Sequence, residues 1–222
     1  MTTYDTVLFD SDGVLVEPPA RETQARATRE AFRAVGVADP APEHVDAVVD
    51  GVTVDGLTDL CRAYDLDRET FWTAREQHDE QSQLSAFRDG RRTRYDDVSA
   101  IGDLSCPRGV VSNNHHSTIE FVLDSFDLDT LFETAYGRPK TIESLRRKKP
   151  NTHYLDRALA DIDADSGLYV GDSQSDIVGA HRAGLDSVFV RRDHCREVSL
   201  SVDPTYEIES LAALPELVTV RD

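Results

Sequence analysis

The chain has 222 residues, a mass of 24.7 kDa and a formal net charge of −18 at pH 7, and it is long enough to bury the core of one domain with an insertion, or of two small domains. The negative charge argues against nucleic acid as a partner, because phosphates are repelled and the basic residues form only short clusters. No apolar run approaches the roughly 18 residues of a membrane-spanning helix, so no membrane partner is expected.

The first predicted element is a buried strand over residues 4–9, which leads directly into the turn Asp10-Ser11-Asp12-Gly13. Side chains alternate along an extended chain, so Asp10 and Asp12 point the same way, and Gly13 lets the chain turn. Ionised carboxylates repel each other at short range, so such a pair binds a cation, shares a proton or divides the roles of acid and base. An acidic turn without chemistry is the alternative, because Asp-Gly is common in turns.

A helical insertion follows this strand, because residues 17–88 contain no convincing strand. Amphipathic patterns predict helices over residues 21–35, 42–49, 54–64 and 68–84. Pro18-Pro19 at its start and Asp89-Gly90 at its end are the expected hinge points.

The rest of the chain alternates short apolar runs with helical patterns, which is typical of an α/β fold. The runs lack strict polar alternation, as expected for parallel strands that are buried on both faces. Strands are predicted over residues 109–112, 133–136, 168–171 and 187–190, with a weaker one over 206–208. Helices are predicted over residues 117–126, 153–159, 177–183 and 210–214.

Polar motifs follow several of these strands, where open parallel sheets bind their ligands. They are Phe9-Asp10-Ser11-Asp12-Gly13-Val14, Val111-Ser112-Asn113, Lys149-Pro150 and Gly171-Asp172-Ser173-Gln174-Ser175-Asp176. In this order they resemble the four motifs of the haloacid dehalogenase-like hydrolase superfamily, and the match covers essentially the whole chain. The insertion resembles the cap domain of the subclass that contains phosphoglycolate phosphatases, β-phosphoglucomutases and dehalogenases. The resemblance implies a Rossmann-like catalytic core over residues 1–16 and 89–222, with a helical cap domain over residues 17–88.

The resemblance implies three catalytic side chains. Asp10 would be the nucleophile that forms an aspartyl-phosphate, and Asp12 would protonate the leaving alkoxide and then activate water. Lys149 would balance the charge of nucleophile and phosphate, and Lys148 is the alternative if the alignment shifts by one position.

The resemblance also implies two sets of binding residues. Ser112 and Asn113 would bind the phosphoryl oxygens through hydroxyl and backbone N–H groups at a helix start, although a capped turn is the simpler reading of such a run. Mg²⁺ would be held by Asp10, the backbone carbonyl of Asp12, Asp172 and Asp176, because this ion prefers oxygen ligands. Helix capping is the alternative role for the last two carboxylates.

A phosphatase acting on a small phosphorylated metabolite, with phosphoglycolate as a family-level guess, fits these motifs best. Halide leaves without a proton, so a dehalogenase does not need an acid at Asp12, whereas an ester releases an alkoxide that does. A phosphomutase would keep the same motifs and stays open, and a non-catalytic binding protein would be expected to lose one of these residues. Glu17-Pro18-Pro19 departs from the Asp-Ser or Asp-Thr pair of many relatives, so the substrate loop differs.

Several other residues carry weaker signals. Arg138 lines the same mouth or forms a surface salt bridge, and the adjacent His115 and His116 point about 100° apart on a helix, which disfavours a zinc pair. Phe71 and Trp72 are expected in the core of the insertion rather than on a dimer surface, and the sequence leaves monomer and homodimer open.

Composition gives one indication of the environment. Only three of the 24 basic residues are lysines, and such an acidic, lysine-poor composition resembles that of proteins from salt-accumulating halophiles. Cys61, Cys106 and Cys195 form no CxxC pair, so we expect free buried thiols. Together these features favour a cytoplasmic protein.

Overall fold

A computed structural model describes residues 3–218. Contacts within the chain define a sheet unit (Met1–Pro18, Thr93–Arg138 and Arg147–Asp222) and a helical unit (Pro19–Arg92 and Pro139–Arg146). The divisions at residues 18 and 92 lie close to the boundaries expected from sequence. Pro139–Arg146, which the sequence placed with the sheet, groups with the helical unit because Ile142 and Leu145 pack into its core.

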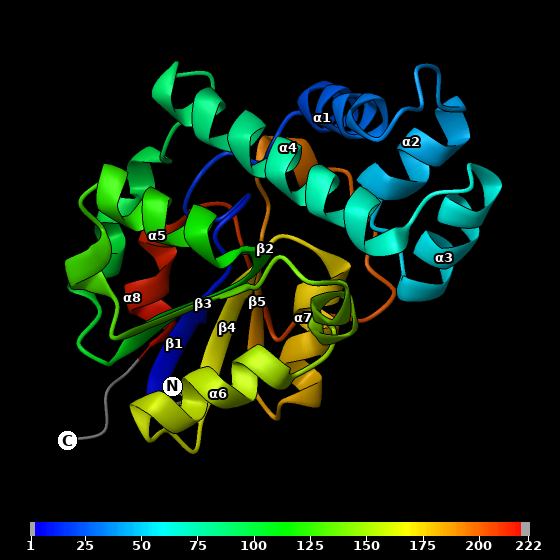
Figure 1. The fold of residues 1–222 in the computed structure, drawn as a ribbon. Coiled ribbons are helices and arrows are strands. Elements are labelled where there is room, and N and C mark those ends of the chain that lie inside the picture. Colours follow the sequence, from blue (N-terminus) through cyan, green and yellow to red (C-terminus); the bar gives the residue numbers. More distant parts are fainter. Residues whose placement is uncertain (1–2, 219–222) are drawn as a thin grey trace. The chain divides into compact units, whose positions relative to one another are not determined.

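The sheet unit contains a six-stranded sheet within residues 3–218, in the order β3-β2-β1-β4-β5-β6 (Figure 1). Every neighbouring pair is parallel, which confirms the predicted fold class. The strands are β1 (Thr6–Phe9), β2 (Arg108–His115), β3 (Thr134–Arg138), β4 (Gly167–Gly171), β5 (Asp186–Val190) and β6 (Tyr206–Ile208). Since β1 lies between β2 and β4, the polar residues that follow these three strands arrive at one edge of the sheet.

Both faces of the sheet are covered, because successive side chains of β1 enter two different cores. Val7 and Phe9 belong to a cluster that includes residues of α5 (His116–Ser125), of α8 (Leu214–Leu217) and of the 3₁₀ segment Asp96–Asp103. Leu8 belongs to a second cluster with residues of α6 (His153–Ile162) and α7 (Gln174–Arg182). A parallel sheet buried on both faces in this way is Rossmann-like, as expected.

The helical unit consists of α1 (Arg21–Ala34), α2 (Pro42–Val49), α3 (Val54–Ala63) and α4 (Arg68–Arg88). Its core is aromatic: the rings of Phe32 and Phe71 lie 4.6 Å apart between centroids, and Trp72 is buried beside them. Asp67 caps α4, since its Oδ1 accepts a hydrogen bond from the backbone N–H of Thr70 at 2.8 Å.

The chain enters and leaves this insertion at one point of the sheet unit. The backbone N–H of Glu17 donates to the carbonyl of Thr93 at 3.0 Å. The backbone N–H of Thr93 donates in return to the Glu17 carboxylate at 2.8 Å. Residues 76 positions apart in sequence are therefore joined by a pair of hydrogen bonds.

Element ends differ from the sequence expectations by a few residues. β1 begins at Thr6 rather than residue 4, and β2 continues through the polar residues to His115. α4 ends four residues later than predicted, because residues 85–88 remain helical before Gly90 turns the chain at φ 67°. The helix expected over residues 210–214 begins as the 3₁₀ turn Leu211–Ala213 and becomes α8, and the tail at 219–222 lies outside the described residues.

Two composition-based expectations are addressed by the structure. The three cysteines are free and buried, as expected. Within residues 3–218, no helix combines the length and apolar character needed to cross a membrane.

Candidate active site

Asp10 and Asp172 lie side by side because their strands are neighbours. Asp10 directly follows β1 and Asp172 directly follows β4, and the register pairs Phe9 with Val170. The backbone N–H of Asp10 donates to the Val170 carbonyl at 2.9 Å, so the chain stays paired up to the first carboxylate.

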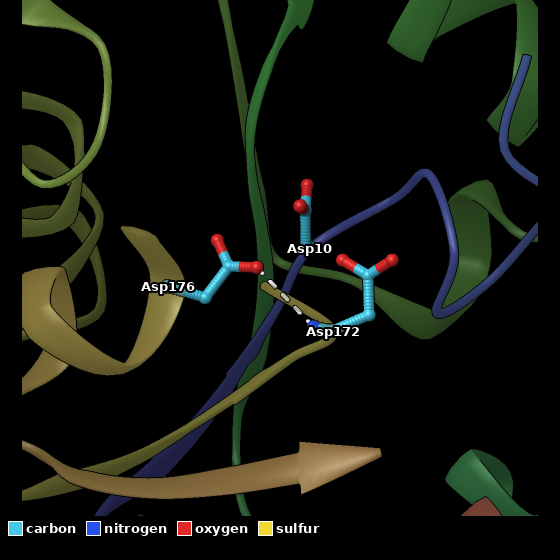
Figure 2. A group of neighbouring side chains, drawn as sticks. All are labelled: Asp10, Asp172 and Asp176. Carbon is cyan, nitrogen blue, oxygen red and sulfur yellow. Dashed lines mark hydrogen bonds between the residues drawn. The ribbon is translucent and has the colours of Figure 1, made fainter. Parts of the chain in front are cut away.

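Asp176, in the first turn of α7, completes a group of three carboxylates (Figure 2). One oxygen from each of Asp10, Asp172 and Asp176 lies within 4.8 Å of the others. Asp10 is only 8% exposed and Asp176 is fully buried. Burial raises the pKa of Asp10 to about 7, opposed by the charge of Lys149 and reinforced by the neighbouring carboxylates. Burial also raises the pKa of Asp172.

Lys149 is the cation of this site. Its Nζ lies 3.1 Å from Asp10 Oδ2 and 2.8 Å from Asp176 Oδ1, and it donates to the Val111 carbonyl at 3.0 Å and to the hydroxyl of Tyr169. The side chain is buried, which lowers its pKa, but the charges of the two carboxylates outweigh this and raise the pKa above its ordinary value. The expected position beside Asp10 is therefore occupied by Lys149 rather than Lys148.

Asn113 and Ser112 lie in the last part of β2, where their side chains organise the chain locally. Lys149 donates its backbone N–H to Asn113 Oδ1 at 2.7 Å, and Asn113 Nδ2 donates to the Lys149 carbonyl at 3.4 Å. The amide of Asn113 thus fixes the backbone of Lys149. Ser112 is buried, and its Oγ accepts a hydrogen bond from the backbone N–H of Asn114 at 3.3 Å.

The Asp12 carboxylate has different surroundings from that of Asp10. It is half-buried, and its Oδ2 accepts a hydrogen bond from Asn114 Nδ2 at 2.8 Å. Its side chain is not a member of the three-carboxylate group found among the described residues. The two carboxylates therefore have different polar neighbours, Lys149 for Asp10 and the amide of Asn114 for Asp12.

Asp176 serves α7 as well as the site. Its Oδ2 accepts hydrogen bonds from the backbone N–H groups of Asp172 at 3.2 Å and Ser173 at 3.0 Å, the first of which is drawn in Figure 2. The Ser173 hydroxyl donates to the same oxygen and completes a capping box. The capping role that the sequence left open is therefore real for Asp176, while its Oδ1 faces Lys149.

Three neighbouring residues were not among the expected site residues. Tyr169 contacts Lys149, and Asn114 contacts Asp12. His194, on the 3₁₀ turn Asp193–Cys195, donates from Nε2 to Asp172 Oδ2 at 2.6 Å. Asn114 adjoins a recognised motif, but His194 follows β5 in a segment without any recognisable pattern.

Arg138 is buried rather than on the surface. Its Nε donates to the Asn113 carbonyl at 3.1 Å, and its Nη2 lies 3.1 Å from His115 Nε2. His116 instead accepts the backbone N–H of Gly137 on its Nδ1 at 3.2 Å. The two adjacent histidines therefore have separate partners.

The three carboxylates fit a divalent cation. When ionised they carry three negative charges in a buried space where Lys149 supplies one positive charge, and such an imbalance is unfavourable away from water. All three offer oxygen, the donor that Mg²⁺ prefers. The site thus has the excess negative charge and the oxygen donors that this ion needs.

Comparison with known proteins gives one match in sequence over most of the chain. The family model described as haloacid dehalogenase-like hydrolase matches residues 7–190. Pyrophosphatase PpaX of Bacillus mycoides (strain KBAB4) is 32% identical over 100 residues, which are 44% of this chain and 45% of that protein.

Solved structures share the fold. A predicted phosphoglycolate phosphatase from Haemophilus somnus 129PT superposes with a TM-score of 0.70 at 22% identity, over 98% of this chain and 99% of that one. The 2-haloacid dehalogenase from Pseudomonas syringae pv. tomato DC3000 superposes with a TM-score of 0.64 at 21% identity, over 97% and 98% of the two chains. Both a described phosphatase and a dehalogenase therefore have this fold, and the site must distinguish them.

Proposed function

The chain belongs to the family of haloacid dehalogenase-like hydrolases, and from its site we propose that it is an Mg²⁺-dependent phosphatase that hydrolyses a small phosphorylated metabolite. The main support is the buried group of Asp10, Asp172 and Asp176 with Lys149. A carboxylate nucleophile must approach a phosphoryl group that is itself negative, and cations must offset that repulsion. When bound by these carboxylates, Mg²⁺ would shield the repulsion and stabilise charge on the transferring group.

In the first step Asp10 attacks phosphorus through a carboxylate oxygen. A bond forms between this oxygen and phosphorus while the bond from phosphorus to the substrate oxygen breaks, which gives an aspartyl-phosphate. Lys149 lies 3.1 Å from Asp10, and its charge opposes the rise in the Asp10 pKa that burial causes, which favours the ionised nucleophile. Asp12 gives its proton to the departing alkoxide, and its hydrogen bond from Asn114 fixes the orientation of this acid.

In the second step Asp12, now ionised, takes a proton from water as the water attacks phosphorus. The bond from phosphorus to Asp10 breaks, inorganic phosphate is released, and Asp10 and Asp12 return to their starting forms. Ser112 and the backbone N–H groups near it would bind the phosphoryl oxygens, while Asn113 maintains the position of Lys149.

Asp12 favours a phosphatase over a dehalogenase. A halide leaves without needing a proton, whereas an alkoxide is basic and needs an acid such as the half-buried Asp12. The helical unit would then be the cap domain that selects the substrate. The names of the relatives suggest phosphoglycolate and pyrophosphate as the first compounds to assay.

Hydrolysis of p-nitrophenyl phosphate, with and without Mg²⁺, tests the proposal. We expect turnover by the wild type with Mg²⁺, none by Asp10→Asn, and unchanged turnover by Asp203→Asn, which alters an exposed carboxylate. Equal turnover by wild type and Asp10→Asn would refute the assigned nucleophile. A panel of phosphorylated metabolites, with chloroacetate included, then addresses the substrate, and a preference for chloroacetate would overturn the phosphatase proposal.

We further propose a cytoplasmic location in a halophilic host, on the strength of the three free thiols and the excess of acidic residues. The thermal midpoint should then rise with KCl, since salt screens the mutual repulsion of a chain with charge −18. Full stability at millimolar salt would contradict this assignment.

A further inference from the structure

His194 contacts a member of the carboxylate group from outside it. Its Nε2 donates to Asp172 Oδ2 at 2.6 Å, a short hydrogen bond. The His194 side chain is 29% exposed and that of Asp172 is 13% exposed, so water competes little for the carboxylate oxygen. Because this bond engages Oδ2, it favours Oδ1 as the oxygen of Asp172 that would bind a metal.

The backbone around His194 is fixed by its neighbours on both sides. Arg192 forms a two-point ion pair with Asp97, at 2.7 and 2.8 Å, and donates to the Val14 carbonyl at 3.0 Å. Its guanidinium also lies over the ring of Tyr95, at 4.0 Å from the centroid. The bond to Val14 anchors the segment after β5 to the loop that follows Asp12, and the contacts with Asp97 and Tyr95 anchor it to the start of the 3₁₀ segment Asp96–Asp103.

Cys195 anchors the other side of His194. Its side chain is buried and its backbone N–H donates to the Arg192 carbonyl at 3.0 Å, which closes the 3₁₀ turn around the histidine. With Arg192 and Cys195 held on either side, few backbone conformations of His194 remain, and its imidazole is pre-organised toward Asp172.

Gly13 makes room for this contact. A Cβ at this position would lie 1.9 Å from Asp172 Oδ2 and 3.0 Å from His194 Nε2. The backbone of Gly13 also has φ 78°, a conformation that other residues rarely adopt. The loop after β1 therefore approaches the junction of Asp172 and His194 as closely as a residue without a side chain allows.

We propose that His194 is a positioning residue of the metal site, which holds the Asp172 carboxylate through Oδ2 and directs it toward Asp10 and Asp176. This inference rests on the proposed metal site, and it adds to that site a side chain that would not touch the metal or the substrate. Hydrogen-bond partners of metal ligands fix ligand orientation, and their loss typically weakens metal binding about 10- to 100-fold.

Mn²⁺ binding to the full chain tests the proposal without relying on turnover. The free ion is measured by electron paramagnetic resonance in wild type, His194→Ala, His194→Gln and His78→Gln. We expect a Kd about 10- to 100-fold higher for His194→Ala. The Kd of His194→Gln should stay close to that of the wild type, because its amide N–H can replace the imidazole donor. His78→Gln, a matched substitution on α4, should not change the Kd.

Each further outcome has a defined meaning. An unchanged Kd in His194→Ala, or a loss in His194→Gln as large as in His194→Ala, overturns the positioning role. A nitrogen coupled directly to Mn²⁺ in the wild type that disappears in His194→Ala also overturns it, because His194 would then be a ligand. Absence of Mn²⁺ binding in the wild type overturns the metal site itself, and thus the proposed function, together with the role of His194. Thermal midpoints of all four proteins in EDTA should agree, and a midpoint lowered in both His194→Ala and His194→Gln but not in His78→Gln assigns a structural role and overturns the proposal.

Discussion

Replacement of Asp10 by asparagine should abolish turnover and, in the absence of metal, stabilise the folded protein at alkaline pH. Burial raises the pKa of this carboxyl from 3.8 to about 7 in the folded protein, while the unfolded chain keeps the ordinary value. Between these pH values the folded protein holds a proton that the unfolded chain has lost. The free energy of unfolding therefore falls as the pH rises through this window, and the full penalty is present above about pH 7.

The size of the effect follows from the pKa difference. One pH unit corresponds to about 1.36 kcal/mol, so a rise from 3.8 to about 7 gives up to about 4 kcal/mol at pH 8. Asparagine resembles the protonated carboxyl in shape and has no charge, so it escapes this penalty. Lys149 does not become an isolated buried charge in the variant, because Asp176 remains 2.8 Å from its Nζ.

Urea unfolding at pH 8 in EDTA, at one fixed salt concentration, measures the difference. We expect a higher midpoint for Asp10→Asn than for the wild type at an unchanged m-value, and a gap that narrows toward pH 4. Mg²⁺ at 100 times its Kd should stabilise the wild type by about 2.7 kcal/mol and the variant less, which narrows the gap at pH 8.

The matched control is Asp203→Asn, which removes an exposed carboxylate of the same unit and should leave the midpoint and its pH dependence unchanged. A lower midpoint for Asp10→Asn in EDTA at pH 8 would refute the reasoning. It would mean that attraction to Lys149 outweighs burial and repulsion from the other carboxylates, and that Asp10 is ionised at little cost in the metal-free protein.

Three further substitutions have defined expectations. Lys149→Gln leaves two buried carboxylates without their cation and should lower the free energy of unfolding by about 3–5 kcal/mol in urea titrations at pH 8. The control Lys140→Gln removes a partly exposed ion pair with Glu80 and should change the free energy of unfolding by less than about 1 kcal/mol. Similar values for the two lysines would contradict this. Asp12→Asn should slow hydrolysis of an alkyl phosphate by about 10²- to 10⁴-fold in steady-state assays. With p-nitrophenyl phosphate the same variant should release a burst of nitrophenol, because this better leaving group needs no acid in the first step. Equal slowing of both substrates without a burst would argue against the acid role. Phe71→Ala should destabilise the protein by about 3–5 kcal/mol in thermal unfolding, and a small effect would show that the core of the helical unit can collapse around the cavity.

The sheet could be predicted from sequence because its strands are short apolar runs buried on both faces. The predicted bounds of β4 and β5, residues 168–171 and 187–190, lie within one residue of the observed ones. The apolar runs of these strands reflect burial on both faces, so the ends of each run mark the ends of the strand. The predicted β1 began too early, because the ring of Tyr4 is buried like a strand residue, although Tyr4 lies before Thr6, where pairing with β4 begins.

The candidate site was predictable where it consists of motifs, and the roles of its residues stay predictions. The motif residues Asp10, Asp172 and Asp176 do come together, because strand order places the ends of β1 and β4 next to each other. Sequence favoured Lys149 and kept Lys148 as the alternative for a shift of one position. Tertiary structure places Lys149 beside Asp10 and Asp176, since burial against two carboxylates is a property of the folded chain.

The remaining features depend on contacts that have no local pattern. Pro139–Arg146 groups with the helical unit through Ile142 and Leu145, two apolar residues in a short 3₁₀ segment that resembles a loop in sequence. His194 contacts Asp172 across 22 positions of the chain. A single histidine after a strand gives no periodicity or spacing that would indicate its partner.

The paired hydrogen bonds between Glu17 and Thr93 have a consequence for how this chain can change over evolution. For the folding of the sheet unit, the segment between these two residues behaves as a single loop whose ends are joined by these hydrogen bonds. The entropy of closing such a loop grows only with the logarithm of its length, by roughly 0.6 kcal/mol for each doubling. Helices can therefore be lengthened, shortened or exchanged within the insertion with little effect on the stability of the sheet. If the insertion selects the substrate as proposed, substrate preference can diverge without change to the residues at the ends of β1 and β4.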